Sequence, residues 1–157
     1  PSAWGTGPDD VPPSITAGDA APQPLGDAAT ALGSVATASD GTDVSALFDD
    51  TSATTATFTV ANPFVTVQLL AGARQVAFYT LTSGIAEGAA PTSWIVRGSS
   101  DGINWTLIDK RAGEKFRWRN QTRAFKVAIP GAYAFYRIEL MAPPSTTLAE
   151  MELLARP

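Results

Sequence analysis

The stretch of sequence that decides the fold is residues 91–105, which read PTSWIVRGSSDGINW. Two short apolar runs, at 94–96 and 105–108, flank the dipeptide Asp101-Gly102. An Asp-Gly pair between apolar runs predicts a β-hairpin, because Gly accepts the positive φ that a tight turn requires. We therefore expect two antiparallel strands, with Trp94 and Trp105 in the core and Asn104 bonded to the backbone of the turn.

Outward from this hairpin, the chain from residue 33 onward also has the pattern of short strands. Apolar side chains alternate with other residues at 65–69, 125–129, 136–140 and 151–153, which is typical of half-buried strands. Turn residues separate these segments: Asn62-Pro63, Ala71-Gly72, Pro130-Gly131 and Pro143-Pro144. Because no ten-residue segment has a helical stripe, the pattern predicts an all-β fold, an antiparallel β-sandwich.

Residues 1–30 differ from the rest in composition. They are rich in Pro, Ala and Asp and show no apolar period, so we expect an N-terminal arm or linker at 1–30 and the sandwich domain at 31–157. Trp4, Ile15 and Leu25 are the side chains expected to anchor this arm. The chain begins without Met or a leader, so we expect a piece processed or excised from a longer protein.

The composition excludes several kinds of site. The chain has no Cys, which rules out disulfides and thiolate ligands. It has no His, which rules out Ser-His-Asp catalysis and His-ligated zinc within this chain. Only oxygen ligands remain for a metal ion. No apolar run reaches the roughly 18 residues that a membrane-spanning helix needs, so we expect no contact with a membrane.

Several motifs, spread in order from residue 33 to residue 155, resemble one known family. In the hairpin, Pro-x-Ser-Trp is followed by Gly-Ser-x-Asp-Gly-x-x-Trp. The other matches are Ala46, Leu47, Phe48, Asp49 and Thr54, residues 76–79 with Leu81, Thr82 and Ser83, residues 116–125, Tyr133, Phe135, Tyr136 and Arg137, and Leu148, Ala149 and Glu150. Together they resemble the discoidin domain, also called the coagulation factor 5/8 type C domain and similar to carbohydrate-binding module family 32. Within residues 116–125, the resemblance to a version found beside family 92 glycoside hydrolases, which are α-mannosidases, rests on Phe116, Arg119, Asn120, Gln121, Thr122, Arg123 and Phe125.

The resemblance implies a discoidin-type jelly roll of about eight strands. In bacterial secreted glycosidases such a domain is a carbohydrate-binding module, so the resemblance also implies a secreted bacterial location. The chain departs from the family at Ala56, where members commonly carry Trp. We expect Phe58 or Phe64 to fill the core at that place.

The resemblance further implies a structural calcium ion. By position, Asp49 and Glu150 would supply carboxylates and Thr54 its hydroxyl and carbonyl, and the remaining ligands would be the carbonyls of Ala46, Thr51 and Ala149. Such a set of oxygens suits calcium, which takes six to eight of them. The alternative is that Asp49 and Glu150 are solvated or cap a loop.

Sugar sites of discoidin-type modules lie on loops at one end of the sandwich, which here are 83–91, 113–123 and 142–147. We expect Trp118 to stack on a pyranose, Arg117 or Arg119 to donate to its hydroxyls, Asn120 to donate and accept, and Glu87 to accept. The third loop offers only Pro and hydroxyls and is expected to form a wall. The alternative for Trp118 is a ring lying flat on its own sheet. Some relatives bind galactose through a His, which this chain lacks. We therefore expect weak binding, or binding of mannose-type or other neutral glycans.

Three functions other than sugar binding are conceivable for this sequence: nucleic-acid binding, glycoside hydrolysis and a purely structural role. The basic segment 110–126 contains Trp118, a combination that suggests binding of nucleic acid. However, the chain before Arg74 is acidic and contains no Lys or Arg, and the sequence pI is about 4.7, which disfavours a phosphate partner. No spacing among the Glu residues marks the carboxylate pair of a glycosidase. We therefore expect a monomeric, non-catalytic carbohydrate-binding module linked to the catalytic domain of its parent chain. The alternative is a structural domain that packs against a catalytic partner and binds no sugar.

Overall fold

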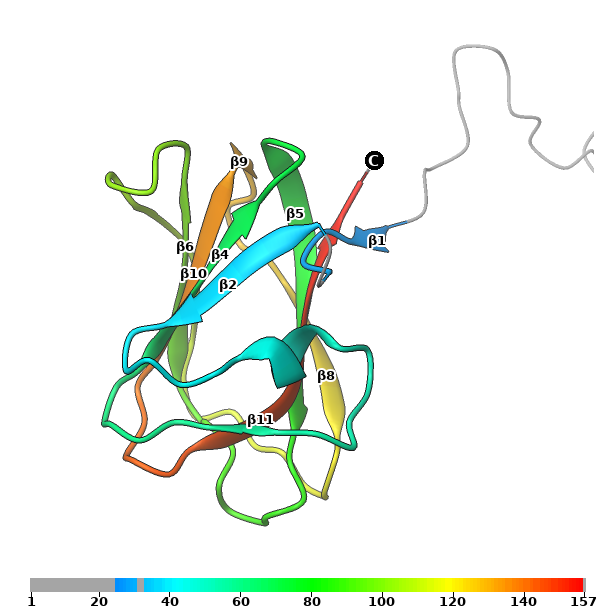
Figure 1. Cartoon of the computed structure of the whole chain (residues 1–157), viewed down its shortest axis with the longest axis vertical. Helices are drawn as coiled ribbons and strands as arrows, with labels where there is room; N and C mark the ends of the chain where they lie inside the picture. The colour runs from blue at the N-terminus through cyan, green and yellow to red at the C-terminus, as the bar shows by residue number, and fades with distance from the viewer. Residues whose placement is uncertain (1–24, 31–32, 157) are drawn as a thin grey trace, which may run out of the picture.

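The described residues, 25–30 and 33–156 of the computed structural model, form eleven strands in two antiparallel sheets that pack face to face (Figure 1). The six-stranded sheet has the order β1 (Gly26–Asp27), β11 (Thr147–Ala155), β5 (Arg74–Ser83) and β8 (Thr122–Lys126), with β3 (Ala56–Thr57) paired to β11 and β9 (Ala132–Tyr133) paired to β5. The five-stranded sheet has the order β2 (Ser34–Ala38), β4 (Phe64–Leu69), β10 (Phe135–Leu140), β6 (Trp94–Ser99) and β7 (Thr106–Arg111). The predicted antiparallel β-sandwich is confirmed, and eight of these described strands have five residues or more.

The hairpin predicted around Asp101-Gly102 is the β6–β7 pair. These strands are antiparallel, with Trp94 opposite Arg111 and Gly98 opposite Thr106. Gly102 has a φ of 75°, the left-handed conformation that a glycine adopts without strain. Asp101 Oδ1 accepts hydrogen bonds from the backbone N–H groups of Ile103 and Asn104, both at 2.8 Å. The Asn104 side chain donates to Asp101 Oδ2, so the expectation that it bonds the backbone of the turn was wrong.

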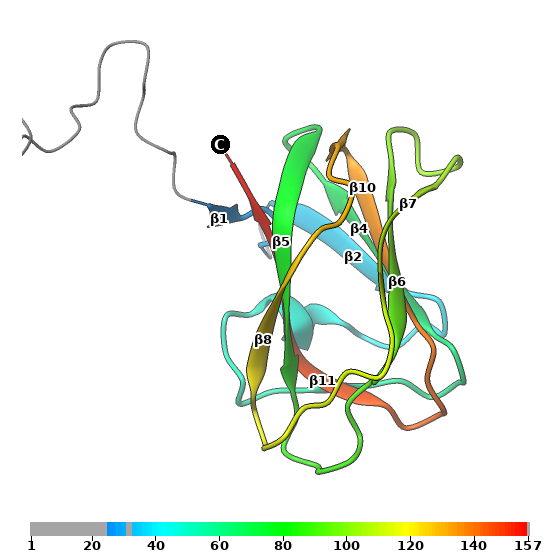
Figure 2. The same ribbon diagram turned by 180° about the vertical axis from the view of Figure 1, so that it is seen from behind.

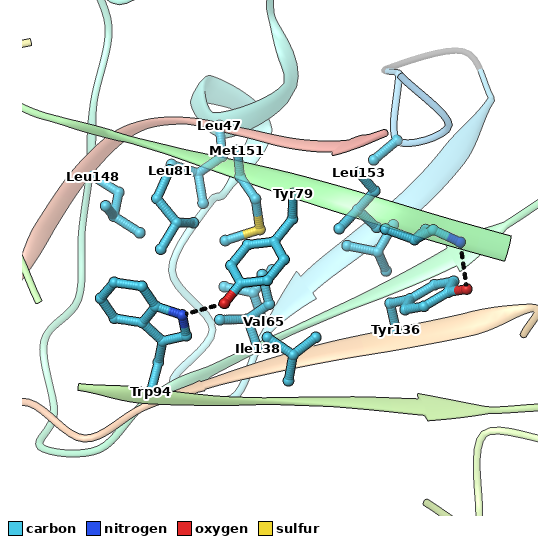
Figure 3. Close-up of a cluster of buried hydrophobic side chains, with 14 of the residues drawn as sticks. Leu47, Val65, Tyr79, Leu81, Trp94, Tyr136, Ile138, Leu148, Met151 and Leu153 are labelled. Carbon is cyan, nitrogen blue, oxygen red and sulfur yellow. Dashed lines mark hydrogen bonds between the residues drawn. The ribbon is translucent and has the colours of Figure 1, made fainter. Parts of the chain in front are cut away.

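The two Trp residues of the hairpin differ in burial. Trp94 is fully buried between the sheets, where its indole N–H donates to the hydroxyl of Tyr79 at 2.8 Å (Figure 3). Trp105 was predicted to lie in the core, but it is only half-buried and the guanidinium of Arg137 lies 4.1 Å from its ring centroid. Side chains alternate along a strand, and Ile108 points inward, so Trp105 falls on the outer face.

Period-two alternation placed most core residues correctly. Buried inward-facing side chains come from both sheets: Val65, Val67, Leu69, Tyr136, Ile138, Leu140, Met151 and Leu153. Phe125 and Val127 are also buried, but β8 ends at Lys126 and Ile129 is exposed. The alternation at 125–129 therefore predicted a strand that continues beyond Lys126, where β8 ends.

The core near the family's missing Trp is filled by Phe58. Ala56 and Phe58 are both buried, and Phe58 is fully inaccessible. Phe64, the other residue considered, is half-buried, with the Arg137 guanidinium 4.3 Å from its ring centroid. A buried aromatic side chain thus lies directly after β3, two residues beyond Ala56.

Paired structure begins before residue 31. Gly26 and Asp27 pair with Ala155 and Leu154 of β11, and Ala29 is buried. Trp4 and Ile15 lie outside the described residues, and the division into an arm and a domain stays a prediction there. Among the described residues, no helix is long and apolar enough to cross a membrane.

The connecting loops after β5, β7 and β10 gather at one end of the sandwich, and the C-terminus lies toward the other (Figures 1 and 2). These loops are 84–93, 112–121 and 141–146. They contain most of the residues predicted to bind a sugar. The fold therefore brings together segments that are far apart in the sequence.

Candidate functional site

Backbone hydrogen bonds join the three loops at this end. The N–H of Asn120 donates to the carbonyl of Gly84 at 3.2 Å, and the N–H of Glu114 donates to the carbonyl of Thr92 at 2.9 Å. The N–H of Thr147 donates to the carbonyl of Ala89 at 2.8 Å. Because the first loop is bonded through main-chain groups to the second loop and to the residue that follows the third, the relative positions of the loops depend little on side-chain rotamers.

A pocket of about 240 Å³ lies between the first two loops. Four of the five residues predicted to bind a sugar line it: Glu87, Arg117, Trp118 and Arg119. The fifth, Asn120, does not line the pocket; its φ of 49° places it in the turn, where its backbone bonds Gly84. Phe116 contributes a second aromatic ring to the lining.

Trp118 projects its ring toward solvent. The residue is 60% exposed, so it does not lie flat on its own sheet. Its backbone is held in place: the carbonyl of Trp118 accepts a hydrogen bond from Ser83 Oγ at 3.1 Å. The same Ser83 Oγ accepts from the N–H of Gln121 at 3.0 Å, and Gln121 Oε1 accepts from the N–H of Arg117 at 2.6 Å. An exposed ring on a fixed loop needs little ordering when it stacks on a ligand.

Sequence reasoning missed Ser83 and Gln121 as residues that fix this loop. Ser83 is buried at the end of β5 and bonds residues 35 and 38 positions away. No local pattern carries such a signal, because the contact depends on how β5 and β8 pair. In that pairing, Thr82 lies opposite Thr122, which brings Ser83 beside Gln121 at the end of the Trp118 loop.

Glu87 and Arg119 face each other across the pocket. Arg119 Nε lies 3.4 Å from Glu87 Oε1, and both side chains are largely exposed. Such an exposed pair is weak, so either partner can turn toward a ligand at small cost. Arg119 and Glu87 can therefore donate to and accept from adjacent hydroxyl groups.

A second pocket of about 460 Å³ lies on the other side of the first loop. It shares Glu87, Gly88 and Ala90 with the first pocket. Its far side is formed by residues 141–146, the loop that was expected to be a wall. The segment around Gly88 thus separates two hollows at the same end of the sandwich.

Of the residues predicted to hold calcium, Asp49 and Thr51 lie near Glu150. Glu150 is only 7% exposed, and neither oxygen of its carboxylate has a well-formed hydrogen bond among the described residues, although the backbone N–H groups of Asp50 and Thr51 lie near it. Burial, followed by the nearby negative charge of Asp49, raises the pKa of Glu150 to about 7. The alternative of a solvated Glu150 is therefore wrong. A buried carboxylate without a donor is expensive unless a cation or a proton compensates it.

The loop opposite Glu150 is arranged by Asp49. One Asp49 oxygen accepts from the N–H of Thr51 at 3.2 Å, and the other accepts from the hydroxyl of Thr54. Asp49 thus caps its own loop, which was the alternative considered for it. Ala46 lies in the 3₁₀ helix η2 (Ser45–Phe48), which packs on β11.

A β-bulge shapes the other side of this site. The register of β11 against β5 shifts between Leu148 and Glu150, which leaves Ala149 without a partner in that ladder. Bulges re-aim side chains, and they free backbone groups from the ladder. Ala149 and Glu150 therefore lie where a carbonyl and a carboxylate can serve one ion together with the 49–54 loop.

More carboxylates lie close by on the same face, and sequence reasoning did not single them out. One oxygen from each of Asp27, Asp50 and Glu152 lies within 4.8 Å of the others. A pocket of about 300 Å³ is lined by Asp50, Glu150 and Glu152 together. This concentration of negative charge favours a cation at this face.

The comparisons with known proteins bear on the fold. No protein-family model matches the chain. A segment of 60 residues, 38% of this chain, is 32% identical to a peptide-N(4)-(N-acetyl-beta-glucosaminyl)asparagine amidase of Arabidopsis thaliana, but it spans only 8% of that protein. The match is too short to assign the chain to a family.

Solved structures with a similar fold include several carbohydrate-binding modules. Chitosan-binding module 1 of a chitosanase/glucanase from Paenibacillus sp. IK-5 has a TM-score of 0.62 and 22% identity, covering 81% of this chain and 97% of that one. The family 32 module of Clostridium perfringens NanJ, solved with galactose, has a TM-score of 0.63 and 15% identity, covering 77% and 93%. The family 32 module of Streptococcus pneumoniae EndoD has a TM-score of 0.67 and 9% identity, covering 84% and 100%. At these identities the likeness shows the fold, a β-sandwich that the chain shares with carbohydrate-binding modules of family 32 and related families.

Proposed function

We propose that this chain is a non-catalytic carbohydrate-binding module. The observation that carries the proposal is Trp118, a largely exposed indole beside a pocket lined by Glu87, Arg117 and Arg119. The apolar C–H face of a pyranose can stack on this ring while its hydroxyls meet the charged groups. This combination of one aromatic surface and a few polar groups is what small-ligand sites require. The shared fold of the carbohydrate-binding modules supports the same function.

The proposed role of such weak binding is to raise local concentration. A module linked to a catalytic domain keeps that domain near its glycan, so the second encounter becomes intramolecular. The resemblance of residues 116–125 supports a secreted bacterial glycosidase as the parent, with an α-mannosidase as the specific expectation. The chain's termini lie away from the loops in Figure 1, as far as the described residues extend, which leaves the pocket open when a partner domain is attached.

We further propose that calcium binds between the 46–54 loop and β11. The donors fit this ion: the unpartnered carboxylate of Glu150, the carboxylate of Asp49, and oxygens of Ala46, Thr51, Thr54 and Ala149. Calcium would supply the positive charge that these carboxylates lack and would tie the loop to the sheet. Its role is structural, because this face carries a different set of residues from the Trp118 pocket.

A glycan array followed by NMR titration of the intact chain tests sugar binding. We expect at least one glycan to be retained and to shift the indole N–H signal of Trp118. If no glycan binds, even at millimolar concentration of monosaccharide, the sugar-binding function is wrong and the chain is a structural domain. Turnover of a glycoside by the isolated chain would contradict its assignment as non-catalytic.

A further inference from the structure

The Trp118 loop carries an excess of positive charge on a protein that is negative overall. The chain has a formal net charge of −4. Beside the Trp118 pocket lies a further hollow of about 220 Å³, and Arg117 lines both. Six charged side chains line these two adjoining hollows: Glu87, Glu114, Lys115, Arg117, Arg119 and Arg123. Four of the six are cations, which is the reverse of the balance in the whole chain.

Each of the two carboxylates already has a cationic partner. Glu87 pairs with Arg119 at 3.4 Å, and Glu114 pairs with Arg123 at 2.7 Å. The second pair is fixed more firmly, because the Arg123 guanidinium also packs 4.9 Å from the ring centroid of Phe125. These pairs leave the positive charges of Lys115 and Arg117 uncompensated.

The backbone of Arg117 is held in place, but its side chain takes no part in holding the described fold together. Its backbone N–H bonds Gln121 Oε1 at 2.6 Å, which fixes the start of its side chain. Within the described part of the chain, the guanidinium itself makes neither a hydrogen bond nor an ion pair. The residue is exposed and lies directly before Trp118. A guanidinium presents a planar set of donors that matches a carboxylate or a sulfate in two parallel bonds.

Resting on the proposed sugar-binding function, we infer that this site takes an acidic sugar, one whose ring carries a carboxylate or a sulfate group. The ring stacks on Trp118, and the anionic group meets Arg117, with Lys115 adding to the local potential. The Glu87–Arg119 pair, which also lines the pocket, is left to bind hydroxyl groups. This ligand class differs from the neutral glycans that the sequence led us to expect, because the sequence did not show which arginines are already paired.

Nucleic acid fits the same surface less well. A nucleic-acid backbone requires a continuous basic track, whereas the uncompensated charge here is limited to Lys115 and Arg117. Carboxylates lie on both sides of them, at Glu87 and Glu114. A single anionic group beside one stacking ring is the arrangement that this patch accommodates.

The test is to titrate the intact chain with pairs of monosaccharides that differ only at carbon 6. The pairs are glucose and glucuronate, galactose and galacturonate, and mannose and mannuronate, followed through the indole N–H signal of Trp118. Galactose 6-sulfate separates recognition of a sulfate from recognition of a carboxylate. We expect the acidic member of at least one pair, or the sulfated sugar, to bind about tenfold more tightly than its neutral counterpart. Added salt should reduce this preference.

Two matched variants locate the effect. Arg117→Gln should remove the preference for the acidic sugar and leave the weaker binding of the neutral sugar in place. Arg156→Gln removes the same charge near the C-terminus, at the other end of the sandwich, and should leave the preference intact (Figure 1). A preference that survives in Arg117→Gln would overturn the assignment to this residue.

The remaining outcomes separate this inference from the proposed function. If acidic and neutral sugars bind equally and both lose binding in Trp118→Ala, the acidic-ligand inference is wrong and sugar binding stands. If none of these sugars binds and the glycan array is also empty, the proposed function fails and this inference with it. A single-stranded oligonucleotide that displaces every sugar from Trp118 at lower concentration would assign the patch to nucleic acid and overturn the inference.

Discussion

The hydroxyl of Tyr79 on β5 donates a hydrogen bond of 2.5 Å to Asp109 Oδ2 on β7, and so joins the two sheets through the core. The same hydroxyl accepts from the indole N–H of Trp94 at 2.8 Å (Figure 3). Asp109 is almost fully buried and also accepts from Arg111 Nε at 3.0 Å. Burial and the adjacent carboxylate of Asp109 both raise the pKa of Tyr79, so the phenol stays protonated and can donate.

Removing this hydroxyl should destabilise the fold. Tyr79→Phe leaves a buried indole N–H without an acceptor and a buried carboxylate with one donor fewer, which typically costs about 1–3 kcal/mol. The free energy of unfolding from urea titration measures the loss. Tyr133→Phe is the matched control, because within the described residues the Tyr133 hydroxyl makes no hydrogen bond. Equal stabilities of the two variants would mean that the Tyr79–Asp109 bond contributes nothing.

Trp118→Ala should separate binding from stability. Stacking on an exposed indole is expected to contribute roughly 1–2 kcal/mol, so this variant should bind its glycan about tenfold more weakly. Because Trp118 is 60% exposed, the free energy of unfolding should change by less than about 0.5 kcal/mol. Ile103→Ala removes another exposed apolar side chain, on the β6–β7 loop, and should leave binding unchanged. A loss of several kcal/mol of stability in Trp118→Ala would contradict its role at the surface.

Local sequence patterns predicted those parts of the fold that local geometry determines. The Asp101-Gly102 pair gave the hairpin, since a turn depends on the conformation of a few consecutive residues. Alternation gave the inward residues of β4 and β10, since neighbouring side chains on a strand must point to opposite faces. Trp105 was misplaced because its apolar character was taken to imply burial, whereas the alternation of side chains from the buried Ile108 puts it on the outer face.

The sequence predicted which residues form the candidate site, but not which of their charged side chains pair with one another. The sequence identified Trp118 and its charged neighbours because a Trp lies between Arg117 and Arg119 in a basic segment. It could not show that Glu87 pairs with Arg119 while Arg117 has no such partner among the described residues, because these contacts cross between loops 30 residues apart. Nor could it show that Glu150 is buried near residues 49–51, since that burial depends on a contact between segments about 100 residues apart in the sequence.

Chelation should lower the melting temperature of the chain, and added calcium should restore it. Binding to the folded state alone stabilises by mass action, about 2.7 kcal/mol when free calcium is 100 times its dissociation constant. Glu150→Gln should abolish this response. Glu87→Gln makes the same change in the Trp118 pocket and should retain it. Identical melting curves with chelator and with calcium would show that the chain binds no stabilising calcium ion.

In the presence of chelator, Glu150 should also make stability depend on pH. Burial raises its folded-state pKa from 4.5 to about 7, so the folded chain binds this proton more tightly than the unfolded chain does. Stability from this group is therefore fully present below about pH 4.5 and is lost as the pH rises toward 7. The full pKa shift would correspond to roughly 3 kcal/mol, and solvent in the adjoining pocket screens part of it, so the expected loss is about 1–3 kcal/mol. Urea unfolding across this pH range measures it.

Glu150→Gln should flatten the profile and be more stable than the parent chain above pH 7. Saturating calcium should flatten the profile of the parent chain. If the parent chain in chelator has the same pH profile as Glu150→Gln, burial does not raise the pKa of this carboxyl.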